Sequence, residues 1–85
     1  MSSTLTVYIT KPTAPLCARV CDFLDSRGYT YETIEVVSDA DREAMQRRTG
    51  RRACPLVLVG DQLIGQLEET IEAERSGRLA ELLAN

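Results

Sequence analysis

The stretch that decides the fold of this 85-residue chain is Lys11-Pro12-Thr13-Ala14-Pro15-Leu16-Cys17. The residues before it, Leu5 to Thr10, are β-branched, aromatic and apolar enough to predict a strand that is central in a sheet covered on both faces. Pro15 suits the first position of a helix, where its missing N–H costs no hydrogen bond. Apolar residues at helical spacing then extend this helix to about Arg27. Cys17 therefore lies one turn inside the first helix.

The next forty residues predict two more strands and a second helix. Residues from Tyr29 to Val37 alternate in the way typical of a strand. Ser38 caps a helix that has acidic residues in its first turn and ends at Gly50. Leu56 to Val59 predicts a buried strand. The second helix carries only a thin apolar stripe, made of Ala40, Ala44 and Met45.

The last third predicts a hairpin followed by helix. Gly60-Asp61 is a hairpin signal, and Gln62 to Ile64 is the returning strand. A third helix begins near Leu67 and is broken by Gly77. Leu67 and Ile71 are expected on its inner face. A short last turn or helix is expected to pack through three leucines, Leu79, Leu82 and Leu83.

The element order β-α-β-α-β-β-α predicts one α/β domain that spans residues 1–85. A strand-helix-strand start predicts a right-handed crossover and a parallel first strand pair. The final hairpin makes the four-stranded sheet mixed. We therefore expect a three-layer α/β/α sandwich.

The composition excludes several classes of partner. A net charge of −3 argues against nucleic acid, because phosphate binding needs a surplus of cations. No apolar run approaches the ~18–20 residues of a membrane span, and the first residues show no basic region that would mark a secretory signal. We expect a monomer in the cytoplasm.

Three cysteines, Cys17, Cys21 and Cys54, are too few for the disulfide framework of a small secreted domain. The chain has no histidine, so these thiols do not complete a structural zinc site. We expect no metal.

At this point the chain resembles the glutaredoxins, over essentially its whole length. Four segments carry the resemblance in the family's order, and the family has a thioredoxin-like fold. They are Val7 to Cys17, Arg48 to Pro55, Ile64 to Glu69 and Ser76 to Leu79.

The family's Cys-Pro-x-Cys motif appears here as Ala14-Pro15-Leu16-Cys17. A thiolate at a helix N-terminus attacks the disulfide in this chemistry, because the helix stabilises the anion. The resemblance places that nucleophile at Ala14, so the usual catalysis is predicted to be lost. Cys17 corresponds to the second, resolving cysteine. The alternative for Cys17 and Cys21 is a pair of small core residues.

Cys54 precedes Pro55, which the resemblance implies is a cis-proline facing the start of the first helix. A functional interpretation makes Cys54 a displaced reactive thiol or a disulfide partner for Cys17. The structural interpretation makes it a filler of valine size. A disulfide requires Cα atoms within about 7 Å.

The resemblance also implies a glutathione site. Its members would be Lys11 before the motif, Leu16 within it, the backbone around Cys54 and Pro55, and the acidic pair Glu68-Glu69 at a helix start. Two positions depart from the family: Gln66 replaces a glycine, and Leu16 stands where an aromatic residue is frequent. A side chain at position 66 is expected to crowd backbone that approaches the ligand.

Four arginines, Arg47, Arg48, Arg51 and Arg52, surround the end of the second helix. One of them, Arg52 or Arg48, is expected to hold a glutathione carboxylate. The alternative is a solvated face, where cations suit the helix dipole.

Three hypotheses follow. The first is a glutaredoxin-type thiol–disulfide oxidoreductase or glutathione-handling protein that uses Cys17 or Cys54, with glutathione or a protein thiol or disulfide as partner. The second is a non-catalytic binding or interaction module on the same fold. The third, glutathione-assisted iron–sulfur binding, needs the thiol that Ala14 lacks and is the least favoured.

Overall fold

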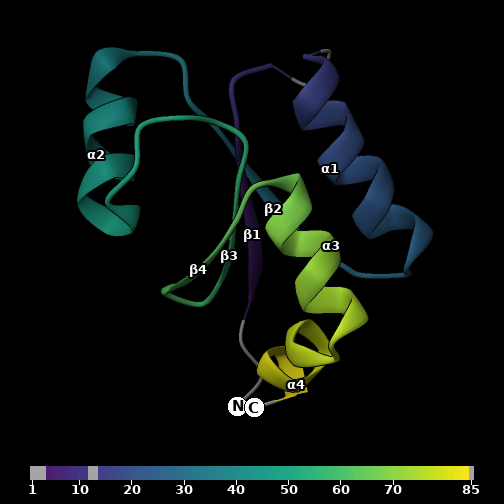
Figure 1. The fold of residues 1–85 in the computed structure, drawn as a ribbon. Helices are drawn as coiled ribbons and strands as arrows, with labels where there is room; N and C mark the ends of the chain where they lie inside the picture. The colour runs from purple at the N-terminus through teal and green to yellow at the C-terminus, as the bar shows by residue number, and fades with distance from the viewer. Residues whose placement is uncertain (1–3, 12–13, 85) are drawn as a thin grey trace.

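The computed structural model describes residues 4–11 and 14–84, and its centre is a four-stranded sheet of order β2-β1-β3-β4 (Figure 1). β1 pairs in parallel with β2 and antiparallel with β3, and β3 pairs antiparallel with β4. The predicted mixed sheet and parallel first pair are thereby confirmed. The strands are β1 (Leu5–Ile9), β2 (Glu32–Glu35), β3 (Leu56–Val59) and β4 (Gln62–Gly65).

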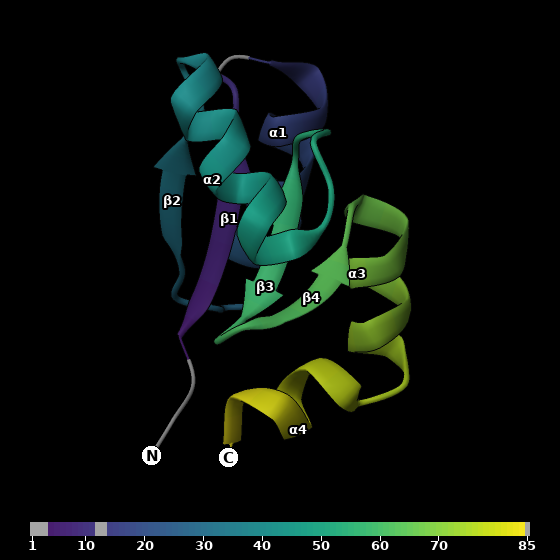
Figure 2. The same cartoon turned by 90° about the vertical axis from the view of Figure 1, so that its left-hand side faces the viewer.

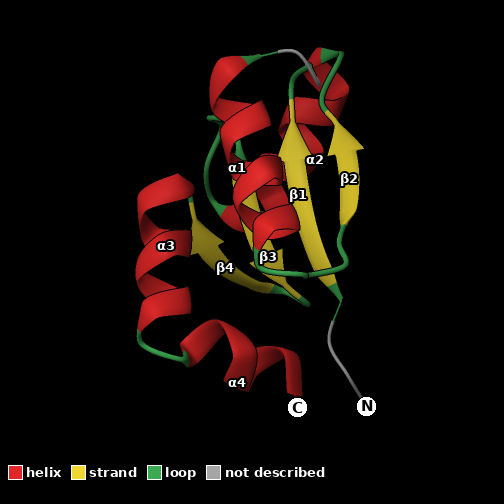
Figure 3. Ribbon diagram, turned by 90° about the vertical axis from the view of Figure 1, so that its right-hand side faces the viewer, coloured by secondary structure: helices red, strands yellow, loops and turns green. Residues whose placement is uncertain are grey.

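Helices cover both faces of this sheet. α1 and α3 lie on one face and α2 on the other (Figures 1 and 2), which confirms the three-layer architecture. The last segment forms a helix of its own, α4, below α3 (Figure 3). None of the helices described is long and apolar enough to cross a membrane. The helices are α1 (Pro15–Ser26), α2 (Asp39–Thr49), α3 (Leu67–Arg75) and α4 (Arg78–Ala84).

Alternation along the central strands divides the core between the two faces. On the α1 and α3 face, the odd-numbered residues of β1 pack with Cys17, Leu24 and Leu79. On the α2 face, Tyr8 packs with Met45 and with two leucines of β3. All of β1 and β3 is buried, as their continuous apolar sequences predict.

β2 is shorter than the predicted strand from Tyr29 to Val37. The ladder pairs only Glu32–Glu35 with β1, and all four residues are exposed because β2 is an edge strand. Before it, the Tyr29 N–H bonds the carbonyl of Leu24 and so belongs to the end of α1. The prediction extended the strand into both connections.

α2 begins and ends as predicted, but its apolar stripe is narrower. The Ser38 hydroxyl accepts from the Asp41 N–H at 3.2 Å, and the Asp41 carboxylate accepts from the Ser38 N–H at 3.2 Å. Gly50 ends the helix in the left-handed conformation that glycine favours. Ala40 and Ala44 are exposed, so Met45 is the one buried side chain of the helix.

The inner face of α3 matches the prediction in part. Leu67 is half-buried and packs against the core as predicted. Ile71 is only half-buried, and the buried residues of α3 are Thr70 and Ala73. Thr70 tolerates burial because its hydroxyl donates to the Gln66 carbonyl at 2.7 Å. Short side chains therefore allow α3 to approach the sheet closely.

Candidate functional site

Ala14 is the N-cap residue of α1, immediately before its first turn. Ala14 has extended backbone angles, and its carbonyl accepts the first helical bond from the Ala18 N–H at 2.9 Å. Its own N–H donates to the Lys11 carbonyl at 3.1 Å. Within residues 4–11 and 14–84, no side chain caps the helix. A methyl group thus occupies the position where the resemblance expected the nucleophilic thiol.

Cys17 lies inside the core. It is 2% exposed and packs with Val20 and Leu24 on the inner face of α1. Its Sγ lies 3.9 Å from the Thr10 Oγ1, which is its polar neighbour. A thiol with so little exposure has poor access to a disulfide in solution.

Cys54 is half-buried and packs against the core cluster that contains Met45. Its Sγ donates to the Met45 Sδ at 3.6 Å. Burial raises the pKa of the Cys54 thiol, and the charge of Arg42 opposes that rise only in part. All three cysteines of the chain are free in this structure. The peptide bond between Cys54 and Pro55 is cis.

Three segments enclose a groove of about 310 Å³: the start of α1, the segment that enters β3, and the start of α3. Four of the predicted glutathione residues meet there, namely Leu16, Pro55, Glu68 and Glu69. Three further residues complete the wall. They are Arg19, Gln66 and Leu67.

Arg19 is a groove residue that the sequence argument missed. It lies three positions after Leu16 on α1, so the helical period places both side chains on one face. That spacing was the available signal. Arg19 forms no ion pair with any residue of the ranges 4–11 and 14–84.

The two carboxylates that line the groove differ in their hydrogen-bond partners. The Glu69 Oε1 accepts from the Gln66 N–H at 3.1 Å and so caps α3. The side chain of Glu69 also packs over Gly65, where an added Cβ would lie 2.8 Å from the Glu69 Cβ. Glu68 is exposed and has no hydrogen-bond partner in the described part of the chain. Glu68 is thus the carboxylate that remains available to a ligand.

Lys11 and Arg52 do not line the groove. Lys11 is exposed and contributes its carbonyl to the turn before α1. Arg52 borders a separate hollow beside α2, where its Nη1 donates to the Gln46 Oε1 at 2.6 Å. Its carbonyl in turn accepts from Arg42. Arg19, and not Arg52, is thus the arginine that lines the groove.

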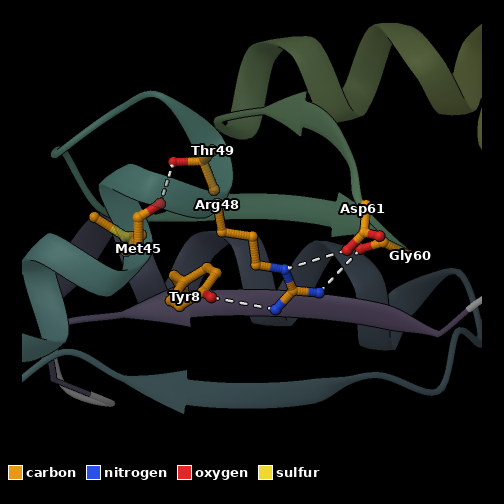
Figure 4. Close-up of polar contacts among 6 residues, drawn as sticks. All are labelled: Tyr8, Met45, Arg48, Thr49, Gly60 and Asp61. Atoms are coloured by element: carbon orange, nitrogen blue, oxygen red, sulfur yellow. Dashed lines mark hydrogen bonds and ion pairs between the residues drawn. The ribbon is translucent and has the colours of Figure 1, made fainter.

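Arg48 has a structural role at the end of α2 (Figure 4). Its Nη1 donates to the Tyr8 hydroxyl at 3.2 Å, and its Nη2 donates to the Gly60 carbonyl at 3.0 Å. An ion pair with Asp61 at 3.7 Å completes the set. These contacts hold α2 to β1 and to the hairpin turn, away from the groove.

The site has the features of a groove that binds a ligand rather than those of a metal centre. Across residues 4–11 and 14–84, no group of three or more histidine, cysteine or acidic side chains is arranged to hold a metal ion. The fold and the groove define a small α/β domain of the thioredoxin-like class, with its pocket between a cis-proline and two helix starts.

Comparisons with known proteins identify the family within that class. The sequence profile described as glutaredoxin matches residues 6–64, so the chain belongs to the glutaredoxin family. The glutaredoxin of Ricinus communis is 31% identical over 87 residues, which cover 98% of this chain and 85% of that protein. Glutaredoxin 3 of Escherichia coli K12 is 32% identical over 75 residues, covering 87% and 90%.

Solved structures agree with this assignment. The crystal structure of a buckwheat glutaredoxin–glutathione complex matches with a TM-score of 0.77 and 31% identity, over 96% of this chain and 77% of that one. A mutated buckwheat glutaredoxin matches with a TM-score of 0.79 and 36% identity, over 98% and 78%. The fold predicted from the sequence is therefore confirmed by glutaredoxins of known structure.

Proposed function

We propose that this glutaredoxin-family protein binds glutathione in the groove without forming the covalent mixed disulfide of thiol exchange. The observation that carries the proposal is the pairing of the groove with Ala14 at the helix start. The buckwheat relative whose structure is a glutathione complex supports the choice of ligand.

The charges in the groove suit a zwitterionic peptide. The exposed carboxylate of Glu68 fits the ammonium group of the γ-glutamyl residue. The guanidinium of Arg19, on the opposite wall, fits a ligand carboxylate in a bidentate pair. The N-terminus of α3 adds backbone N–H groups and the positive end of the helix dipole.

The remaining thiols do not replace the absent nucleophile. Cys17 is enclosed by the core, and the Cys54 thiol donates to the thioether of Met45. Burial holds the pKa of Cys54 above its ordinary value, which lowers its thiolate fraction at neutral pH. Non-covalent binding is thus favoured over catalysis by an unconventional thiol.

Isothermal titration calorimetry with reduced glutathione tests this proposal. The wild-type protein is expected to bind, and Glu68→Gln and Arg19→Gln are each expected to weaken binding about tenfold, the loss of one charge-assisted hydrogen bond. Arg52→Gln is the matched control, because Arg52 lies outside the groove. The same affinity in all four proteins would contradict the site, and no binding by the wild type would contradict the function.

A test of covalent chemistry complements the titration. Intact mass is measured after incubation with oxidised glutathione, followed by peptide mapping. Unmodified thiols are expected. A glutathione adduct on Cys54, or a bond that joins Cys17 to Cys54, would instead establish displaced redox chemistry.

A further inference from the structure

The groove has two chemically different ends. Its polar end lies at the start of α3, where Gln66, Glu68 and Glu69 contribute amide and carboxylate groups. Its opposite wall, at the start of α1, presents the aliphatic side chain of Leu16 beside the guanidinium of Arg19. Leu67 and Pro55 add further hydrocarbon to the lining.

Leu16 is unusually exposed for its type. Its side chain is 54% exposed, and only two other large apolar residues of the described chain, Ile34 and Val37, are classed as exposed. Neither of those two lines the groove. An exposed leucine beside a pocket is more informative than one scattered on a surface, because it marks area that a ligand can cover.

The two residues before Leu16 in the sequence are also apolar. Ala14, Pro15 and Leu16 succeed one another with hydrocarbon side chains only. Pro15 is exposed and Ala14 is half-buried. The segment therefore offers methyl and methylene groups, and no polar side chain, to whatever occupies this end.

We propose that the preferred ligands of the groove are S-substituted glutathiones, thioethers that carry an apolar alkyl or aryl group on the sulfur. This inference rests on the proposed function and names its ligand class. The zwitterionic peptide occupies the polar end, and the sulfur substituent covers Leu16 and its hydrocarbon neighbours. No covalent step is involved.

Glutathione and its S-substituted derivatives differ in how much of the Leu16 side chain they remove from water. With glutathione itself, the hydrocarbon of Leu16 stays in contact with water, and the ligand gains nothing from it. Each methylene of a substituent that is buried there contributes about 0.8 kcal/mol, or about fourfold in affinity.

Calorimetric titration with glutathione and its S-methyl, S-butyl and S-hexyl derivatives tests the inference. Affinity is expected to rise along the series, by at least tenfold from glutathione to S-butylglutathione. In Leu16→Ala the rise is expected to be much smaller. Val37→Ala, which removes an exposed apolar side chain outside the groove, is the matched control and is expected to keep the full rise.

The outcomes separate the two proposals. Equal affinity for glutathione and all three thioethers would overturn the inference and leave the proposed function intact. The absence of binding by every compound would overturn both. S-hexylcysteine, which lacks the flanking residues of the peptide, is expected not to bind; binding as tight as that of S-hexylglutathione would overturn the inference by showing non-specific apolar adsorption.

Discussion

The sulfur of Cys54 lies 3.6 Å from the sulfur of Met45, on the face of the sheet that α2 covers. Cys17 belongs to the core on the other face. The two cysteines that the sequence offered as substitute thiols therefore pack against different partners. This arrangement favours the interpretation of Cys54 as a side chain that fills space beside Met45.

Alkylation of Cys54 is expected to be slow at neutral pH. Because burial raises its pKa, the reactive thiolate becomes abundant only at a higher pH than in an unfolded peptide. Iodoacetamide labelling from pH 7 to 10 with peptide mapping measures this profile, and the same labelling in urea is the control. A native profile that matches the urea profile would contradict the burial argument.

Cys54→Val is expected to change the free energy of unfolding by less than about 1.5 kcal/mol.

Restoring Ala14→Cys is expected to create activity. The new thiol would lie at the N-terminus of α1, where the helix favours the thiolate, and next to the groove. Reduction of a glutathione mixed disulfide is the measurement, with Ala14→Ser as the control that adds a hydroxyl but no thiol. An inert variant that still binds glutathione would show that Ala14 is not aligned with the ligand sulfur.

Arg48→Ala is expected to destabilise the protein by about 1–2 kcal/mol, because it removes the hydrogen bonds to Tyr8 and Gly60. The ion pair to Asp61 adds little, since the Asp61 carboxylate is almost fully exposed. Chemical denaturation measures the change, with Arg47→Ala, an exposed neighbour on α2, as the control. Equal losses in the two variants would show that the contacts of Arg48 do not stabilise the fold.

Gly65→Ala is expected to cost more than Gly50→Ala. Both glycines have a positive φ, but a Cβ at position 65 meets Glu69 at 2.8 Å, whereas nothing lies within 4 Å at position 50. The second variant therefore measures the backbone cost of about 1–2 kcal/mol. The additional loss of stability in Gly65→Ala then reports the contact with Glu69 and the less accessible backbone angle at position 65. Thermal unfolding of both proteins gives the comparison, and no excess would mean that Glu69 moves aside freely.

The cap of α2 predicts a pH dependence. Backbone N–H groups of Val37 and Ser38 lower the pKa of Asp41 in the folded state. A lowered folded pKa contributes stability above the unfolded value of about 3.9, and that contribution is lost as the pH falls through the folded pKa. Asp41→Asn is therefore expected to be less stable than wild type at pH 6, with the difference shrinking below about pH 4. A difference independent of pH would exclude the carboxylate charge as its cause.

Local sequence was sufficient for most of the secondary structure. Local signals act within a few residues of the chain, so they can be recognised without the fold. They are Pro15 at the first helical position, Ser38 with Asp41 at a helix cap, and Gly60 in a hairpin turn. The predicted limits of β2 were wrong because strand length depends on a partner that is distant in the sequence. A strand extends only as far as its partner pairs with it, and β1 pairs with four residues.

The sequence by itself determined the family, the layer order and the absence of a thiol at position 14, because these depend on residue identity and spacing along the chain. Only the tertiary structure decided which side chains share the groove. Arg19 enters it and Arg52 does not, since the rotation of α1 and the contacts of α2 fix those directions. The same packing placed Cys17 and Cys54 in different core clusters, which no spacing in the sequence could reveal.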